Sequence, residues 1–215
     1  MSSPDKRFFF EKYGLNENDV EKYLSAALSA GGDYADLYFE YLTSTSLSVD
    51  ESMVKSASQG ISAGCGVRVI SGERTGYAYT DDLAPARILH AAKTAALIAS
   101  GPAKTPVVDL KTNRRHNLYP VTLPSVDAEI STKVDLVMRA DKAAREFDPR
   151  IKEVRASYAD EYRHIFVVGS DGTFAEDSQP LARMSVFVLA RDEKNSSSKG
   201  TSGGGGRIPL DVFLT

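Results

Sequence analysis

Apolar and polar residues alternate over residues 61–80, and this alternation predicts a β-hairpin. The apolar residues of the first strand occupy every second position: Ile61, Ala63, Cys65, Val67 and Val69. This is the period of a strand that packs one face on a core. The turn sequence 71–74 separates it from a second strand, 75–80, in which small residues alternate with tyrosines. We therefore expect a hairpin with one buried face and one bare, polar face.

The rest of the first half predicts helices on either side of short strands. A helix over 16–30 would bury one stripe: Val20, Tyr23, Leu24, Ala27 and Leu28. Strands are expected over 35–41 and 47–49, with 53–58 as a third strand or a connection. A second helix, capped by Asp81 or Asp82, would turn another stripe inward: Ile88, Ala91, Ala92, Ala95, Ile98 and Ala99. The short links between strands favour an antiparallel sheet.

The second half repeats this plan after a proline-rich connector. A helix over 131–147 has a predicted inner face of Ile130, Val134, Val137, Ala144 and Phe147. Strands are expected over 151–159, 163–169 and 173–191, with Asp171-Gly172 as a hairpin turn. The Ser- and Gly-rich segment 194–207 predicts a flexible loop, and the apolar run 208–214 a further strand.

These elements indicate an α+β fold. We expect two consecutive units, each a helix plus an antiparallel meander, the first closed by a second helix. The predicted boundaries are an N-terminal domain over 1–110, a connector over 111–127 and a central domain over 128–215. The apolar run at the end of the chain suggests that the last domain is truncated.

Composition narrows the classes of function. The 215 residues carry 26 basic and 29 acidic side chains, a net charge of −3. Without a basic stretch we expect no direct nucleic-acid binding, and without a long apolar segment we expect no membrane span. The single cysteine and the absence of a signal-peptide core favour a cytoplasmic protein.

The residues that commonly carry catalysis form no recognisable motif. His90, His116 and His164 are scattered, without the helical spacing of a zinc pair. Cys65 lies on the inner face of its strand, where a thiol is inert. From these residues alone we predict no catalytic residue and no metal ligand.

The outer face of the hairpin is the candidate binding surface. Its residues are Gly64, Gly66, Arg68, Tyr77 and Tyr79. Two glycines allow close backbone approach, the tyrosines supply walls, and the arginine supplies a cation. Such a groove suits an extended peptide or a partner's edge strand. The alternative is a face covered by another domain.

Five segments resemble one protein family. They are GVRVISGERTGYAYTDDL (66–83), ADLYFE (35–40), RADKAARE (139–146), DGT (171–173) and SGGGGR (202–207). Their sequences, their order along the chain and their spacing resemble those of the N-terminal part of TldD-type proteins of the TldD/PmbA family, also called modulators of DNA gyrase.

The resemblance implies part of a zinc metallopeptidase that cleaves unfolded or extended peptides. The family's zinc motif, H-E-x-x-x-H, belongs to the C-terminal half, and no H-E pair occurs in this chain. The resemblance thus places zinc in the full-length parent and none in this fragment. We expect the fragment to be inactive alone and to supply cavity wall, subunit contacts and peptide guidance. The implied partner is a PmbA/TldE-type subunit or a second copy.

Two other functions remain open from the sequence. The chain could be a non-catalytic module that binds peptides or a partner, or a purely structural interaction domain. An H-E-x-x-x-H motif downstream of Thr215 in the reading frame would select the peptidase.

Overall fold

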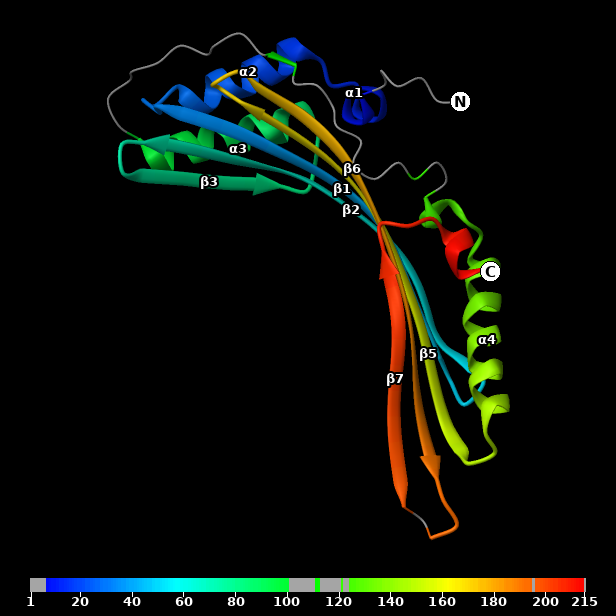
Figure 1. Cartoon of the computed structure of the whole chain (residues 1–215). Coiled ribbons are helices and arrows are strands. Elements are labelled where there is room, and N and C mark those ends of the chain that lie inside the picture. The colour runs from blue at the N-terminus through cyan, green and yellow to red at the C-terminus, as the bar shows by residue number, and fades with distance from the viewer. Residues whose placement is uncertain (1–6, 101–110, 113–120, 122–123, 195, 215) are drawn as a thin grey trace. The chain divides into compact units, whose positions relative to one another are not determined.

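The computed structural model describes residues 7–100, 111–112, 121, 124–194 and 196–214 (Figure 1). Its helices are α1 (Phe8–Tyr13), α2 (Glu17–Leu28), α3 (Pro85–Ala99) and α4 (Ile130–Phe147), with 3-10 turns η1 (Ser125–Asp127) and η2 (Leu210–Phe213). Its strands are β1 (Tyr34–Asp50), β2 (Met53–Ser71), β3 (Arg74–Thr80), β4 (Lys111–Thr112), β5 (Ile151–Gly169), β6 (Thr173–Arg191) and β7 (Ser197–Gly206).

The strands form one sheet in the order β3-β2-β1-β5-β6-β4, and β7 also pairs with β6. The β2–β3 and β6–β7 pairs are antiparallel. Two-residue strand β4 is parallel to β6, with Lys111 opposite Thr173. The α+β class is confirmed.

Several strands are longer than the sequence pattern predicts. β1 is one strand where two were expected, over 35–41 and 47–49, and β2 includes the segment 53–58. The chain turns only at Glu51 and Ser52, whose φ angles are 52° and 56°, as in a two-residue hairpin turn. Likewise β5 joins the predicted strands 151–159 and 163–169. Polar residues alone do not interrupt a strand whose alternation continues.

The described chain divides into two compact units of interleaved segments. The first contains 1–41, 62–117 and 164–178, and the second contains 42–61, 118–163 and 179–215. Strands β1, β2, β5 and β6 each contribute residues to both units. These compact units divide each of the four long strands, and the consecutive domains expected at 1–110 and 128–215 stay a prediction.

In the first unit, helices α2 and α3 bury apolar stripes in one core. The whole predicted stripe of α2 is buried, and the side chain of Asn16 caps this helix by accepting a hydrogen bond from the Asp19 amide at 3.0 Å. Helix α3 packs closely on β3, because a Cβ at Gly76 would lie 2.0 Å from the Ala95 carbonyl oxygen. Glycine permits this contact between backbones.

Four details of the fold differ from prediction. The N-cap of α3 is Ala84, whose amide donates to Asp82 Oδ1 at 2.9 Å, so Asp82 supports the turn before the cap. Ile98 is 56% exposed, and Ala96 takes the buried position. Ile61 is 66% exposed and belongs to the second unit. The sequence pattern also missed α1, which packs three phenylalanines on the core: Phe8, Phe9 and Phe10.

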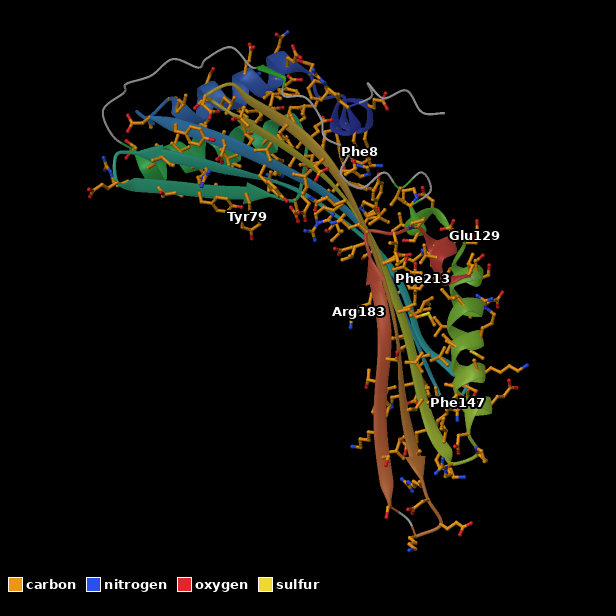
Figure 2. The ribbon with its side chains drawn as sticks, in the orientation of Figure 1. Phe8, Tyr79, Glu129, Phe147, Arg183 and Phe213 are labelled. Atoms are coloured by element: carbon orange, nitrogen blue, oxygen red, sulfur yellow. The ribbon has the colours of Figure 1, made fainter. Side chains whose placement is uncertain are left out.

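In the second unit, α4 covers the apolar face of its strands (Figure 1). Leu136 and Val137 pack with Leu47, Val49 and Tyr158. The prediction that Phe147 points inward is wrong. Phe147 is 86% exposed at the end of the helix (Figure 2).

A buried ion pair joins α4 to β5. Lys133 Nζ lies 2.8 Å from Asp160 Oδ2, and neither side chain is exposed to solvent. Lys133 also donates to Thr45 Oγ1 at 3.1 Å, and the Tyr158 hydroxyl donates to Asp160 Oδ2 at 2.8 Å. A buried charge is tolerated when it is paired and hydrogen-bonded. This network therefore fixes α4 against β1 and β5.

The Gly-rich segment is a strand, so the predicted flexible loop over 194–207 is wrong. β7 pairs with β6 from Ser197 opposite Arg191 to Gly206 opposite Ala182. A Cβ at Gly205 would lie 2.2 Å from the Ala182 carbonyl oxygen, whereas one at Gly204 would meet nothing within 4 Å. Only some of the glycines are required for this pairing. The predicted strand over 208–214 is instead η2, with Leu210 buried.

We predict that Lys133→Met destabilises the chain by about 3–5 kcal/mol, because Asp160 keeps a buried, unpaired charge. Urea unfolding followed by circular dichroism measures this loss. The control is Lys142→Met, on the same helix, whose pair with Glu146 is 3.8 Å long and exposed; its loss should be below about 1 kcal/mol. Adding Asp160→Asn to Lys133→Met should restore stability. Equal losses in the two single variants would contradict the role of the pair.

Gly205→Ala should weaken the β6–β7 pairing, because its Cβ overlaps the backbone of Ala182. We expect a loss of about 1–3 kcal/mol and faster hydrogen exchange of the β7 amides. Gly204→Ala is the matched control, since open space surrounds its Cβ. If the β7 amides exchange equally fast in Gly204→Ala and Gly205→Ala, the close approach of Gly205 to Ala182 does not stabilise the β6–β7 pairing.

Candidate functional site

The β2–β3 hairpin builds the candidate site, and its register sets which side chains face outward. Cys65, Val67 and Val69 are buried against the helices. In the pairing Arg68 lies opposite Tyr77, and Gly66 lies opposite Tyr79. The hairpin and its inner face are thus confirmed from Cys65 onward. Gly72 takes a φ of 56° at the turn.

Both tyrosines of β3 point to the outer face. Tyr77 is 58% exposed and Tyr79 is 76% exposed. Figure 2 shows Tyr79 on the side of β3 away from α3. Because alternate residues of a strand face opposite sides, the burial of Gly76 against α3 sets this orientation.

A hollow of about 320 Å³ lies on this face. Its lining comes from β1 (Tyr38, Glu40), β2 (62–66) and β3 with the following residue (Tyr77, Tyr79, Thr80, Asp81). Four of the five candidate residues line it: Gly64, Gly66, Tyr77 and Tyr79. Their role in binding stays a prediction.

The face is less bare than the two glycines predict. A Cβ at Gly66 would lie 2.6 Å from the Tyr77 hydroxyl oxygen and 3.2 Å from the ring. The Tyr77 ring therefore covers Gly66, which is buried. At Gly64, the nearest atom to an added Cβ would be the Thr80 carbonyl oxygen at 3.1 Å. Gly64 remains half-buried at the hollow.

Arg68 is held by an acidic neighbour and does not line the hollow. Its guanidinium donates from Nε and Nη2 to the carboxylate of Asp36 on β1, with the Nε bond to Oδ2 at 3.1 Å. These hydrogen bonds and the charge of Asp36 raise the pKa of Arg68. Burial, with Asp36 as a second cause, raises the pKa of Tyr34 to about 12. The expected cation of the groove is therefore bound in an ion pair.

Sequence reasoning missed the contribution of β1. The Tyr38 hydroxyl donates to Glu40 Oε2 at 2.7 Å, and both residues line the hollow. The signal was present, since Asp36, Tyr38 and Glu40 alternate with the buried Leu37 and Phe39. What the pattern lacked was the pairing that brings β1 beside β2.

The conventional catalytic candidates lie outside this hollow or are unreactive. Cys65 contributes to the lining but is only 1% exposed, and burial raises the pKa of its thiol, which disfavours the thiolate. His90 is exposed on α3, and His116 lies outside the described residues.

His164 is half-buried in the first unit, beside helix α1. Its ring stacks on Phe8 with centroids 3.7 Å apart, and Nδ1 lies 3.0 Å from Ser178 Oγ. Burial, followed by the charge of Lys12, lowers the pKa of His164 to about 4. A neutral histidine is therefore part of the packing under α1.

No metal centre forms within the described segments. No group of three or more His, Cys, Asp or Glu side chains comes close enough there to hold an ion. Zinc needs three or four such ligands, so these residues do not fit it and we assign no metal step to them. Among the helices that the structure describes, none is long and apolar enough to cross a bilayer.

Comparison with known protein families shows to which family the chain belongs. Residues 35–99 match the PmbA/TldA metallopeptidase domain 1, and residues 123–213 match the PmbA/TldA metallopeptidase central domain. The chain belongs to the PmbA/TldD metallopeptidase family.

Over the aligned residues, curated members of this family are about one third identical to the chain. A metalloprotease TldD homolog of Buchnera aphidicola (from Schizaphis graminum) is 31% identical over 204 residues, 95% of this chain and 42% of the relative. One from Haemophilus influenzae is 34% identical over 185 residues, 85% of this chain and 38% of the relative. The chain thus spans about two fifths of the curated relatives that it matches.

Solved structures share the fold of this chain. A protein named a modulator of DNA gyrase from Thermotoga maritima superposes with a TM-score of 0.72 at 17% identity, over 91% of this chain and 44% of its own. TldE from Thermococcus kodakarensis gives a TM-score of 0.69 at 18% identity, over 88% and 43%.

The chain should lose stability as the pH falls from about 6.5 to about 4, because His164 is harder to protonate when folded. The unfolded chain binds the proton first, so the contribution is present above pH 6.5. In His164→Gln, the melting temperature should change less with pH over this range. The exposed His90 provides the control, His90→Gln, which should keep the slope. An unchanged slope in His164→Gln would contradict the burial of a neutral imidazole.

Proposed function

We propose that this chain forms the wall and peptide-guiding surface of a TldD-type zinc metallopeptidase that cleaves unfolded or extended peptides. Two observations support the proposal: membership of the PmbA/TldD family and the hollow on the outer face of β1, β2 and β3. In this proposal the zinc site lies in the part of the relatives that the chain does not span.

The hollow suits an extended chain for physical reasons. Gly64 leaves the β2 backbone accessible at its floor, and the exposed rings of Tyr77 and Tyr79 give broad apolar contact without fixing one sequence. Binding of this kind depends on backbone and surface contacts, which suits a peptidase with many substrates.

The partner in this proposal is a PmbA/TldE-type subunit or a second copy of the chain. Its support is the TldE fold neighbour together with the family. We infer no direct contact with nucleic acid and a cytoplasmic site of action.

The test measures peptide binding and hydrolysis by the 215-residue chain. A fluorescent, unstructured peptide should bind, and Tyr79→Ala should weaken this binding about tenfold, the effect of losing one exposed anchor. Gly64→Val should do the same by filling the hollow. The control Leu97→Ala removes a similarly exposed apolar side chain from α3 and should leave binding unchanged.

Hydrolysis separates this proposal from a self-contained enzyme. The chain alone should cleave no peptide, with or without added zinc, because no H-E pair is present to begin the zinc motif. Zinc-dependent cleavage by the isolated chain would overturn the assigned role. Peptide binding that persists in Tyr79→Ala and Gly64→Val would place guidance elsewhere.

A further inference from the structure

A small cavity lies between helices α1 and α2, strand β1 and the start of α3, all within the first unit. Its volume is about 20 Å³, and a single water molecule needs roughly 10–15 Å³ of such space. Phe9, Phe39 and Ile88 form apolar walls, and each is at most 2% exposed. The space therefore suits one water molecule and no larger ligand.

Tyr23 lines this cavity, and its hydroxyl group needs a hydrogen-bond partner. The residue is 1% exposed, and no described residue pairs with the hydroxyl oxygen. Leaving a buried polar group unpaired is costly, because the group has lost its hydrogen bonds to solvent. Buried polar side-chain atoms are for this reason nearly always bonded to protein or to ordered water. The Tyr23 hydroxyl thus points to a bound molecule.

Two further polar groups line the same space. Asp19 precedes Tyr23 by one turn on the same side of α2. Burial, followed by the charge of Asp19, raises the pKa of Tyr23 to about 12, so the carboxylate lies near the hydroxyl. Gly14, which follows α1, has no side chain and lines the cavity with backbone atoms. A buried water molecule makes about three hydrogen bonds, and these three residues can supply them.

We propose that this cavity binds one ordered water molecule, held by the Tyr23 hydroxyl and the Asp19 carboxylate. The water accepts a hydrogen bond from the hydroxyl and donates one to the carboxylate. Because α1, α2 and β1 all line the cavity, the water links the two N-terminal helices where they pack on the sheet. A purely apolar cavity would stay dry, so the polar side chains determine its content. This site is independent of the proposed peptide guidance.

Tyr23→Phe tests the site, because it removes the hydroxyl and keeps the ring. If the water is bound, the 215-residue chain should melt about 2–4 °C lower, the shift expected for the loss of one hydrogen bond in a protein of this size. Without a bound water, the same change removes an unpaired buried hydroxyl and should raise the melting temperature. Scanning calorimetry measures the sign of the shift.

Oxygen-17 relaxation dispersion counts the long-lived water molecules directly. We expect the count to fall by one in Tyr23→Phe. The matched control is Tyr79→Phe, which removes a hydroxyl from a ring that is 76% exposed. It should change neither the count nor the melting temperature.

Two results would overturn the site: a melting temperature that stays the same or rises in Tyr23→Phe, or an unchanged number of long-lived waters. If that variant does not fold, the unaltered chain decides. Its Tyr23 ring protons should show a nuclear Overhauser effect to a bound water, and the absence of this effect would refute the proposal. Failure of the peptide-binding test would leave this site standing, since the two measurements share no residue of the cavity.

Discussion

Close packing of β3 on α3 is the constraint on which the candidate site depends. The Gly76 backbone meets the Ala95 carbonyl so closely that a single added methyl group would overlap it. A strand in this position cannot shift by one residue, because a shift would turn Tyr77 or Tyr79 into the helix. The inner face is thereby fixed, and the outer face receives both tyrosines. Site geometry in this protein is a consequence of core packing.

The alternation of buried and exposed residues along an element explains how much of the fold could be predicted from the sequence. Period-two and helical stripes located Cys65, Val67 and the inner face of α2, since burial along one element is a local property. Partners across the sheet were not accessible in this way. The Arg68–Asp36 pair joins residues 32 positions apart, and Lys133–Asp160 joins a helix to a strand. A charged residue read alone predicts a solvated side chain, which is wrong for Lys133.

Glycine was the least predictable residue, because its role depends on what lies opposite. The composition of 194–207 predicted a flexible loop, yet this segment forms β7, and the absence of a side chain at Gly205 permits its close contact with β6. On β2, Gly66 suggested an open notch, but the ring of Tyr77 fills it. An aromatic side chain over a strand glycine restores the apolar contact that the glycine lacks. Sequence motifs located these glycines, and only the structure distinguishes their roles.

The outer face of the hairpin has the properties that the proposed peptide guidance needs. The rings of Tyr77 and Tyr79 are exposed, and Gly64 lies half-buried at the hollow lined by β1, β2 and β3. Broad aromatic surface and accessible backbone contact an extended chain without requiring one sequence. The packing that fixes β3 against α3 therefore also fixes the surface on which the proposed guidance depends.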